Sequence, residues 1–321
     1  MRQPKARVAP PRAMLEADGK SVSRPRHCAV VVSYEPDATA LLKLLAQLDK
    51  EGDFIVVDNG SASIDELETS IRVYKGCRAV DKLGRNEGLA LGLNRGIAWV
   101  REQGYDYVLL FDQDSRPGDR FTQGMLAALK RAEGTSARRV AAVGPRIINP
   151  QTLKQTPFKL FNRLVGRSNR RYHGLRGEYQ ADFLITSGTL IPLNVVDSVG
   201  PMREDYFIDN IDLEWCFRAK ARGYDLIGTD AALLYHAIGE RSDHPWVRAG
   251  LIAQHKPERT FYSSRNRVHL YGKDYAPLGW KLRDLPRFAL KAIWLVLSSP
   301  HRRDYARNIL RGIREARGLA S

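Results

Sequence analysis

The strongest constraint on the fold is an alternation of short apolar runs with helix-like segments in the first part of the chain. Apolar runs lie at residues 28–33, 54–59, 79–83 and 108–111, and each is followed by a polar turn and a stretch with helical spacing of apolar residues. Such short, continuous runs are typical of strands buried on both faces of a sheet. The pattern predicts an α/β fold with a Rossmann-like, mostly parallel sheet and helices on both faces.

Composition places this sheet in an ordinary globular protein. The chain has 321 residues, of which 43% are hydrophobic, so a sizeable core is expected. The three cysteines lie far apart without CxxC spacing, which argues against a disulfide framework or a zinc site. We see neither the apolar core of a signal peptide in residues 1–26 nor an 18-residue uncharged apolar run. These features favour a cytoplasmic protein.

The formal net charge of +15 is concentrated in three segments. Residues 1–26 carry +5, residues 153–176 carry +7 and residues 277–321 carry +7, so the rest of the chain is mildly acidic. On charge alone, such patches suit an anionic membrane or nucleic acid equally well. No RNP-type aromatic motif or helix-turn-helix pattern accompanies them. We therefore expect no nucleic acid partner. A non-catalytic nucleic-acid-binding protein remains the alternative to an enzyme.

Asp112 and Asp114 follow the apolar run at 108–111, and the turn Ser115-Arg116-Pro117 comes directly after them. Carboxylates at the end of such a strand lie at the carboxyl edge, where open α/β sheets bind ligands. Mg²⁺ is commonly held by one or two carboxylates together with substrate phosphates. The motif predicts a metal–diphosphate site, although an isolated pair of acids also occurs in solvated loops.

Two further loops are expected at the same edge. Asp58 ends the second apolar run and could contact a nucleoside or simply form an Asx turn. Asn86 and Gly88 open a predicted helix, whose free N–H groups could attract phosphate. A loop of this composition also makes an ordinary helix cap.

The second half of the chain offers a candidate general base and a candidate metal ligand. Asp209, Asp212 and Glu214 lie within six residues at the start of a predicted helix. One of them could accept a proton from a hydroxyl, while capping of the helix would explain one but hardly all three. His236 ends a predicted strand and could ligate a metal beside carboxylates, or serve only the structure. Arg265 lies among aromatic residues and could bind a diphosphate or a sugar, or belong to a surface helix face.

Together these segments resemble the family 2 glycosyltransferases with the GT-A fold. The resemblance spans about residues 27–270 in unbroken order. Its first half rests on VVVSY at 30–34, VVDNGS at 56–61, GRNEGLALGLNRGI at 84–97 and FDQDS at 111–115. Its second half is similar to the rhamnosyltransferase branch, through FLITSGTLI at 183–191, FIDNIDLEWCFRAKARGY at 207–224, YHAIGE at 235–240 and FYSSRNRV at 261–268.

The resemblance implies roles for individual residues. Asp114 and His236 would hold Mg²⁺ or Mn²⁺, and Asp212 would be the general base. Ile211 stands where the family has a glutamate, so Asp209 is a rival base. Further candidates for catalysis or acceptor binding are Glu214, Ser187, Gly188 and Trp215. Donor contacts are expected from Ser33, Tyr34, Glu35, Asp58, Arg85, Asn86, Gly88, Asp112, Gln113 and Arg265.

The implied reaction is inverting, metal-dependent transfer of L-rhamnose from dTDP-L-rhamnose to a hydroxyl of a lipid-linked cell-surface glycan, as in O-antigen synthesis. A UDP- or GDP-sugar donor on the same fold is the alternative. The expected location is the cytoplasmic face of the inner membrane. The implied organisation is a disordered basic arm at 1–26, a catalytic domain at 27–274 with a nucleotide-sugar half at 27–118 and an acceptor half at 119–274, and a helical segment at 275–321.

The segment 275–321 predicts a basic amphipathic helix. Arg283, Arg287 and Lys291 recur every four residues as a cationic stripe, and Trp294 lies nearby. Leu285, Phe288, Ala292, Leu295 and Val296 fall mostly off that stripe. A helix of this kind suits the membrane interface, where it would lie on the bilayer and contact anionic lipids; the alternative is that it packs on the catalytic domain.

Overall fold

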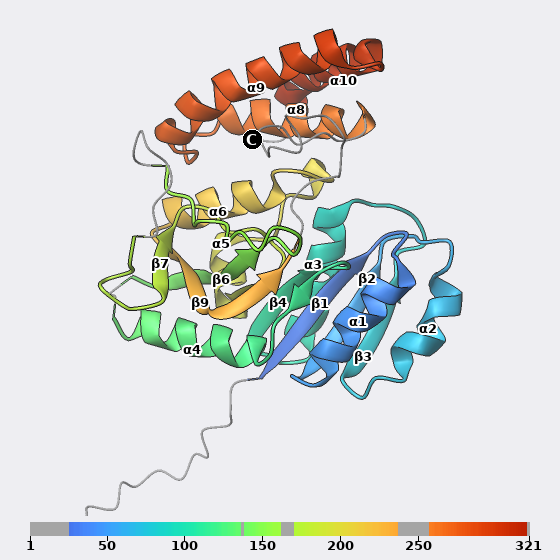
Figure 1. Cartoon of the computed structure of the whole chain (residues 1–321), viewed down its shortest axis with the longest axis vertical. Coiled ribbons are helices and arrows are strands. Elements are labelled where there is room, and N and C mark those ends of the chain that lie inside the picture. Colours follow the sequence, from blue (N-terminus) through green and yellow to red (C-terminus); the bar gives the residue numbers. More distant parts are fainter. Residues whose placement is uncertain (1–25, 136–137, 162–169, 237–256, 320–321) are drawn as a thin grey trace, which may run out of the picture.

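The structure is a computed structural model, and it describes residues 26–135, 138–161, 170–236 and 257–319 (Figure 1). The basic arm expected at 1–26 lies outside the described residues except for Arg26. Residues 162–169 of the basic segment and residues 237–256 also lie outside them.

The described strands form one mixed sheet in the order β3-β2-β1-β4-β8-β6-β9-β5, with β7 paired to β9. Parallel pairing joins β1 to β2 and β4, β2 to β3, and β6 to β9, while β8, β5 and β7 run the opposite way. Six of these nine strands therefore share one direction, which confirms the predicted mostly parallel α/β sheet. Their bounds are β1 (His27–Ser33), β2 (Asp53–Asp58), β3 (Cys77–Lys82), β4 (Tyr107–Asp112), β5 (Arg116–Pro117), β6 (Val140–Ile148), β7 (Glu178–Ala181), β8 (Thr189–Pro192) and β9 (Asp225–Tyr235).

Helices cover both faces of this sheet, as the apolar runs require. One core joins the sheet to α3, α5 and α6, and a second core on the opposite face joins it to α1, α2 and α4. The bounds are α1 (Ala38–Asp49), α2 (Ile64–Arg72), α3 (Leu89–Glu102), α4 (Phe121–Glu133), α5 (Leu193–Val199), α6 (Ile211–Ala221), α8 (Pro257–Tyr271), α9 (Leu278–Ser298) and α10 (Arg302–Glu315), with short 3-10 turns at Glu204–Tyr206 and Ala316–Gly318.

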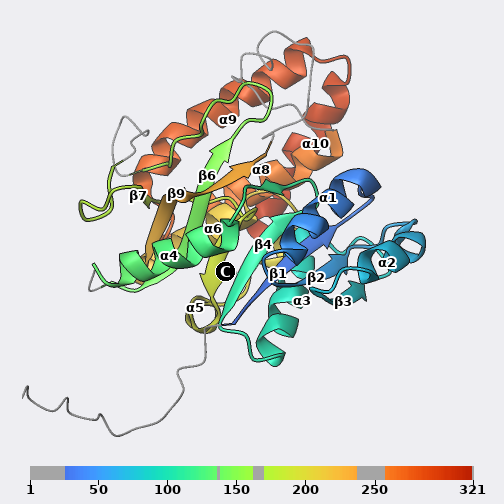
Figure 2. The same ribbon diagram turned by 60° about the horizontal axis from the view of Figure 1, so that its bottom comes forward.

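The last three helices form an additional layer. Figures 1 and 2 show α8, α9 and α10 in orange to red, beyond α6 at the end of the molecule away from β1, β2 and β3. Leu213 and Phe217 of α6 pack against Leu270 of α8 and Trp280 of α9, so α6 lies between the sheet and this layer. Of the described helices, none is both long and apolar enough to cross a membrane.

Two strand predictions in the second half differ from the structure. The apolar run at 183–193 predicts a strand interrupted at Ser187-Gly188-Thr189. The structure has a turn there, but before it only Phe183 pairs, in an isolated bridge to Lys159, and after it Thr189–Pro192 forms β8 and Leu193 already begins α5. The runs at 224–229 and 232–236 were expected to be two strands. They form the single strand β9, because a register shift against β6 absorbs the residues between them.

Strand register brings the predicted donor residues to one edge. Ser33 lies opposite Asp58 in the β1–β2 pair, and Val32 lies opposite Asp112 in the β1–β4 pair. Parallel strands in this register end at the same level, so the loops that follow β1, β2 and β4 converge. The carboxyl edge of the sheet is therefore the place to look for a ligand site.

Candidate active site

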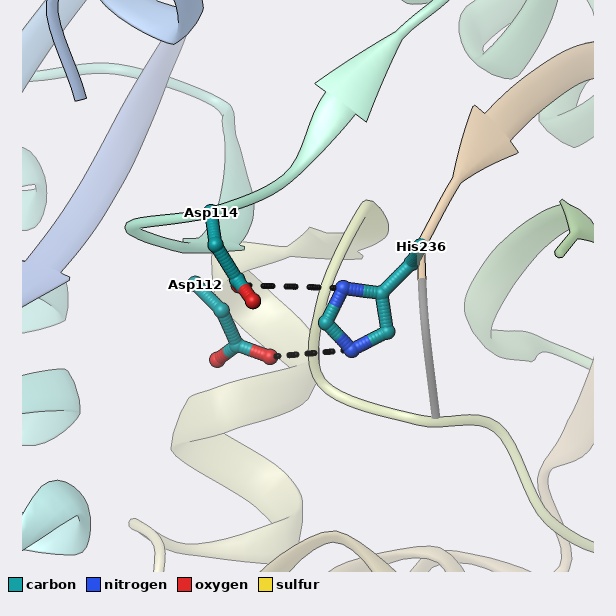
Figure 3. Close-up of side chains that lie close together, drawn as sticks. All are labelled: Asp112, Asp114 and His236. Atoms are coloured by element: carbon teal, nitrogen blue, oxygen red, sulfur yellow. Dashed lines mark ion pairs between the residues drawn. The ribbon is translucent and has the colours of Figure 1, made fainter. Parts of the chain in front are cut away.

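The pairing of β5 with β9 brings His236 to the two aspartates. Arg116, two residues after Asp114, lies opposite Tyr235 in an antiparallel pair, so the next residue, His236, lies beside the Asp112–Asp114 turn. The distance from His236 Nδ1 to Asp114 Oδ1 is 3.7 Å, and that from His236 Nε2 to Asp112 Oδ2 is 4.0 Å (Figure 3). His236, which is distant in sequence, thus lies with the two neighbouring aspartates around one small space.

The donor set of this cluster fits a hard divalent cation. One candidate ligand atom from each residue lies within 4.8 Å of the others. His236 Nδ1 is buried, and no described residue forms a hydrogen bond with it. Burial raises the pKa of the Asp112 carboxyl, with His236 opposing that shift and the negative charge of Asp114 adding to it. Two crowded carboxylates and an unpartnered imidazole nitrogen are the arrangement that a bound cation would relieve.

Ser187 and Gly188 form hydrogen bonds that hold the turn carrying the two aspartates. The Ser187 hydroxyl is buried, hydrogen bonds with the Ser115 hydroxyl and accepts the Asp112 N–H at 3.4 Å. The Gly188 N–H donates to Leu110 O at 2.6 Å, and its φ of 76° is one that glycine adopts readily. Both residues, predicted as catalytic or acceptor-binding candidates, therefore contact the backbone of the aspartate loop. Ser115, which the sequence predicts only as a turn residue, takes part in the same hydrogen bonds.

The loop after β1 is joined to the aspartate turn by Gln113. The Tyr34 N–H donates to Gln113 Oε1 at 2.7 Å, and Gln113 Nε2 donates to Tyr34 O at 3.2 Å. The Tyr34 side chain is exposed and free to contact a ligand. Glu35 accepts the Ala62 N–H at 3.0 Å, which ties the same loop to the turn after β2. These residues surround the aspartates, as expected for donor-binding candidates.

Asp58 lies at the predicted edge but is fully buried. Its carboxylate accepts the hydroxyls of Ser33 at 3.0 Å and Ser61 at 2.6 Å, and the N–H groups of Gly60 at 3.0 Å and Ser61 at 2.8 Å. Both oxygens are thus engaged in organising the β2–α2 turn, which is the Asx-turn arrangement. Ser33 and Asp58 therefore stabilise the conformation of this loop, and their side chains do not line an open cavity.

The helix start at α3 differs from the prediction of free N–H groups. The Gly88 N–H donates to Asn86 Oδ1 at 3.1 Å, and the Leu89 N–H donates to Phe207 O at 2.7 Å. A Cβ on Gly88 would lie 2.6 Å from the Phe207 ring, so only glycine allows this contact. The expectation of a phosphate at these two amides is wrong, because the loop before α6 covers them. Arg85 remains exposed beside Glu87.

Among the three acids near α6, two are held by cations. Asp209 receives a bidentate contact from Arg259 of α8, with Nη2 to Oδ1 at 2.8 Å and Nε to Oδ2 at 3.1 Å. Glu214 is completely buried, pairs with Arg218 at 2.8 Å and accepts the Tyr275 hydroxyl at 2.8 Å. Glu214 as a catalytic or acceptor-binding residue is therefore a wrong prediction, because no substrate can reach it.

The prediction that Trp215 is a catalytic or acceptor-binding residue is also wrong. Its ring is buried in the core beneath the sheet, and its indole N–H donates to Gly200 O at 3.0 Å. Trp215 belongs to the core that joins α3, α5 and α6 to the sheet. Its role is packing.

Asp212 is the acid that remains available. It is half-buried, and among the described residues no cation forms an ion pair with it. Burial raises the pKa of Asp212 to about 6, and the charges of Asp112 and Asp209 raise it further, while a hydrogen bond from the Leu213 N–H and the charge of Lys159 lower it. The influence of Asp112 indicates that the start of α6 faces the metal-ligand cluster.

The loop that presents Asp212 adopts a strained backbone. Phe207, Asp209 and Asn210 have φ values of 60°, 67° and 62°, which are uncommon for residues other than glycine. Buried Asn266 of α8 lies against this loop, and its Nδ2 contacts Tyr206 O at 2.8 Å, Ile208 O at 2.8 Å and Asp209 O at 2.9 Å. A single amide thus holds three carbonyls of the strained turn.

Arg265, a predicted donor or acceptor contact, takes part in the same support. Its guanidinium donates to Asp205 O, and its Nε donates to Asn266 Oδ1 at 3.1 Å. It also lies over the rings of Phe261 and Tyr262. The structure therefore places Arg265 behind the loop rather than in the cluster. Sequence reasoning missed Asn266 and Arg259, although Asn266 stands in the quoted FYSSRN segment.

Comparison with known proteins agrees with this geometry. Residues 35–184 match the model of Glycosyl transferase family 2. The chain is 27% identical to dTDP-rhamnosyl transferase RfbF of Shigella flexneri over 91% of this chain and 95% of that protein. It is 29% identical to galactofuranosyltransferase GlfT1 of Mycolicibacterium smegmatis over 90% of this chain and 93% of that protein.

Solved structures show the same fold. TarS residues 1–349 of S. aureus, in complex with UDP-GlcNAc, superimposes with a TM-score of 0.57 at 13% identity, covering 91% of this chain and 81% of that one. The mannosyltransferase PcManGT of Pyrobaculum calidifontis, in complex with GDP-Man and Mn²⁺, gives a TM-score of 0.55 at 16% identity, covering 94% and 77%. The match of residues 35–184 to Glycosyl transferase family 2 and the similarity to two sugar transferases along nearly the whole chain identify the protein as a glycosyltransferase, and the solved structures show that its fold is of the GT-A type.

Proposed function

We propose that this glycosyltransferase transfers L-rhamnose from dTDP-L-rhamnose, with inversion, to a hydroxyl of a glycan acceptor. The observation that carries the proposal is the placement of Asp212, with which no described residue forms an ion pair, within electrostatic reach of the Asp112–Asp114–His236 cluster. The similarity to RfbF along nearly the whole of both chains supports the choice of donor. The arrangement of the site and the similarity to RfbF both support transfer of rhamnose.

The donor would lie across the loops after β1, β2 and β4. The exposed ring of Tyr34 is suited to stacking on a nucleobase, and Gln113 fixes the backbone that carries it. Asp112 and Asp114 come next along the same edge, where a diphosphate would follow the nucleoside. Arg85, whose side chain is largely exposed, is free to approach the phosphates.

Asp114, His236 and Asp112 would hold Mg²⁺ or Mn²⁺. A divalent cation at that position would offset the charge that develops on the departing nucleoside diphosphate. The two carboxylates also keep the diphosphate from binding productively without it, since they repel a dianion. We therefore expect donor turnover to require a divalent metal.

Asp212 would act as the general base. An acceptor hydroxyl loses its proton as its oxygen attacks the anomeric carbon, and a carboxylate with a pKa of about 6 is mostly ionised at neutral pH. A single displacement needs one base and no covalent sugar–enzyme intermediate. Asp209 is less suited to this role because Arg259 holds its carboxylate.

A donor panel tests the proposal. We would measure turnover with dTDP-L-rhamnose, UDP-glucose, UDP-galactose and GDP-mannose, each with Mg²⁺, with Mn²⁺ and with EDTA. The proposal expects metal-dependent preference for dTDP-L-rhamnose, lost in Asp114→Ala. Preference for a UDP- or GDP-sugar would overturn the rhamnose assignment while keeping the reaction class.

The similarity to GlfT1 favours a second candidate donor. A galactofuranosyl nucleotide therefore belongs in the same panel. If it supports faster turnover than dTDP-L-rhamnose, the chain is a galactofuranosyltransferase with the same base and metal ligands.

We further propose that the acceptor is a lipid-linked glycan of a cell-surface polysaccharide, such as O-antigen, at the cytoplasmic face of the inner membrane. Support comes from the cationic segment at 275–321. A comparison of a polyprenyl-linked oligosaccharide with the free oligosaccharide tests this part. Equal kcat/KM for the two would contradict it.

A further inference from the structure

Helix α9 carries apolar side chains on two sides. On its inner side, Phe288, Leu295 and Val296 pack against Tyr305 and Ile309 of α10. On its outer side, nearly every exposed residue is also apolar. The large ones are Leu278 (68% exposed), Leu282 (65%), Leu285 (54%), Leu290 (67%), Ile293 (56%) and Leu297 (73%).

These outer residues follow the helical repeat. Leu278, Leu282, Leu285, Ala289 and Ile293 are spaced by three or four positions, so they form one continuous stripe along α9. Isolated exposed leucines are common on protein surfaces, but a stripe of this length on one helix is not. A helix with apolar residues both inside and outside is expected to have its outer side covered.

The cationic stripe predicted on α9 does not face solvent as a whole. Arg283 donates to Gly279 O at 2.9 Å and to Leu160 O at 3.2 Å, so it turns toward the catalytic domain. Burial lowers the pKa of Lys291 to about 8. Arg287 remains exposed. Of the three cations in the predicted stripe, only Arg287 is thus exposed, and apolar residues form most of the outer face of α9.

Helix α10 supplies the positive charge instead. Arg303, Arg307, Leu310 and Arg314 are all exposed and follow the helical repeat along one line. Exposed Ile313 lies close to that line. α9 and α10 pack against each other at the end of the molecule away from β1 to β3 (Figure 1), and the apolar stripe and the arginine line each lie on the exposed side of their helix, so both belong to the same helical layer.

We propose that this region, the outer stripe of α9 with the arginine line of α10, docks onto the surface of an anionic lipid bilayer. The leucines would enter the boundary between headgroups and acyl chains, and the arginines would contact the anionic headgroups. No described helix can span the membrane, so the chain would lie on it. A second copy of the chain is the less favoured occupant, because it would bring two strongly cationic segments together.

Flotation of the full chain with vesicles tests this proposal without any enzymatic readout. We expect co-flotation with vesicles of phosphatidylglycerol and phosphatidylcholine, weaker binding to phosphatidylcholine alone, and loss of binding at high salt. The triple variant Leu282→Gln, Leu285→Gln, Ile293→Gln should lower the bound fraction by about tenfold or more. The variant Arg303→Gln, Arg307→Gln, Arg314→Gln should lower it by a similar factor, and mainly on anionic vesicles.

The matched control is the double variant Val73→Gln, Leu153→Gln, which removes two apolar side chains that are each 71% exposed elsewhere on the surface. It should float like wild type. The proposal is overturned if wild type does not bind anionic vesicles, or if the α9 variant binds as well as the control. It is also overturned if wild type is a dimer in light scattering and the α9 variant is a monomer, because a second copy then covers the stripe. Since donor turnover is not measured, failure of this proposal is distinguishable from failure of the proposed reaction.

Discussion

Two acidic regions of the molecule look alike in sequence and differ in structure. At the end of β4, Asp112 and Asp114 point toward a common space with His236, and no described cation compensates them at short range. Near the start of α6, the acids are separated by their partners. Asp209 pairs with Arg259 and Glu214 with Arg218, whereas Asp212 has no ion pair with any residue that the structure describes.

This difference shows that the tertiary structure, through the partners it supplies, decides what each carboxylate can do. Carboxylates that are left crowded and unpaired carry a cost that a ligand can relieve, so they mark a binding site. Carboxylates that already have a cationic partner are compensated within the protein, and removing one partner is costly. At the end of β4, both Asp112 and Asp114 lack a described lysine or arginine partner. Near α6, this is true only of Asp212.

Removal of Asp212 is expected to have the largest effect on turnover. Asp212→Asn keeps the shape of the side chain but cannot accept a proton, so kcat should fall by as much as about 10⁴-fold. Donor binding, measured by calorimetry, should remain. Asp209→Asn is the matched comparison, and a larger loss there would make Asp209 the base.

Asp114→Ala should lower kcat/KM by about 10³-fold, since loss of a metal ligand removes several kcal/mol of charge stabilisation. Mn²⁺ binding, followed by its paramagnetic effect on water relaxation, should weaken in parallel. If turnover persists in EDTA, the β4 cluster is not a metal site.

Asn266→Leu should lower kcat by about 10–100-fold without abolishing donor binding, because the strained loop before Asp212 loses its common hydrogen-bond donor. Asn266→Asp adds a carboxylate beside three carbonyls and should be worse. The pH profile separates positioning from simple destabilisation, since a displaced Asp212 should titrate at a different pH. An unchanged profile with a lower melting temperature would make Asn266 only structural.

Turnover should depend on pH through Asp212. Its pKa is raised to about 6, and only the ionised form accepts a proton. We expect kcat/KM to be level near neutral pH, to halve at about pH 6 and to fall about tenfold per pH unit below that. A profile without an acid limb between pH 5 and 7 would argue against Asp212 as the base.

The smallest effect on turnover is expected for Glu214→Gln. Glu214 is buried with Arg218, so its loss should cost stability, by about 3 kcal/mol or more, rather than activity. Thermal unfolding and kcat measured well below the melting temperature would test this. A large drop in kcat for a fully folded variant would show that the two acidic regions are less distinct than the structure indicates.

Much of the donor half follows from local sequence. The strands β1, β2 and β4 are continuous apolar runs, and their polar ends give Asp58, Asp112 and Asp114 without knowledge of tertiary contacts. Parallel pairing in register then brings these ends together. The prediction was less successful beyond residue 180, where one expected strand is mostly loop and helix, because pairing partners decide strand formation there.

By itself, the sequence determined the α/β class, the carboxyl-edge position of the aspartates and the acidic start of α6, since these depend on local periodicity and on turns. Only the tertiary structure decided that His236 joins the aspartates, that Glu214 and Trp215 are buried, and that no cation in the described part of the chain forms an ion pair with Asp212. It also decided which side of α9 stays exposed. The physical reason is that ion pairing and burial depend on neighbours from distant segments, and no local pattern encodes them.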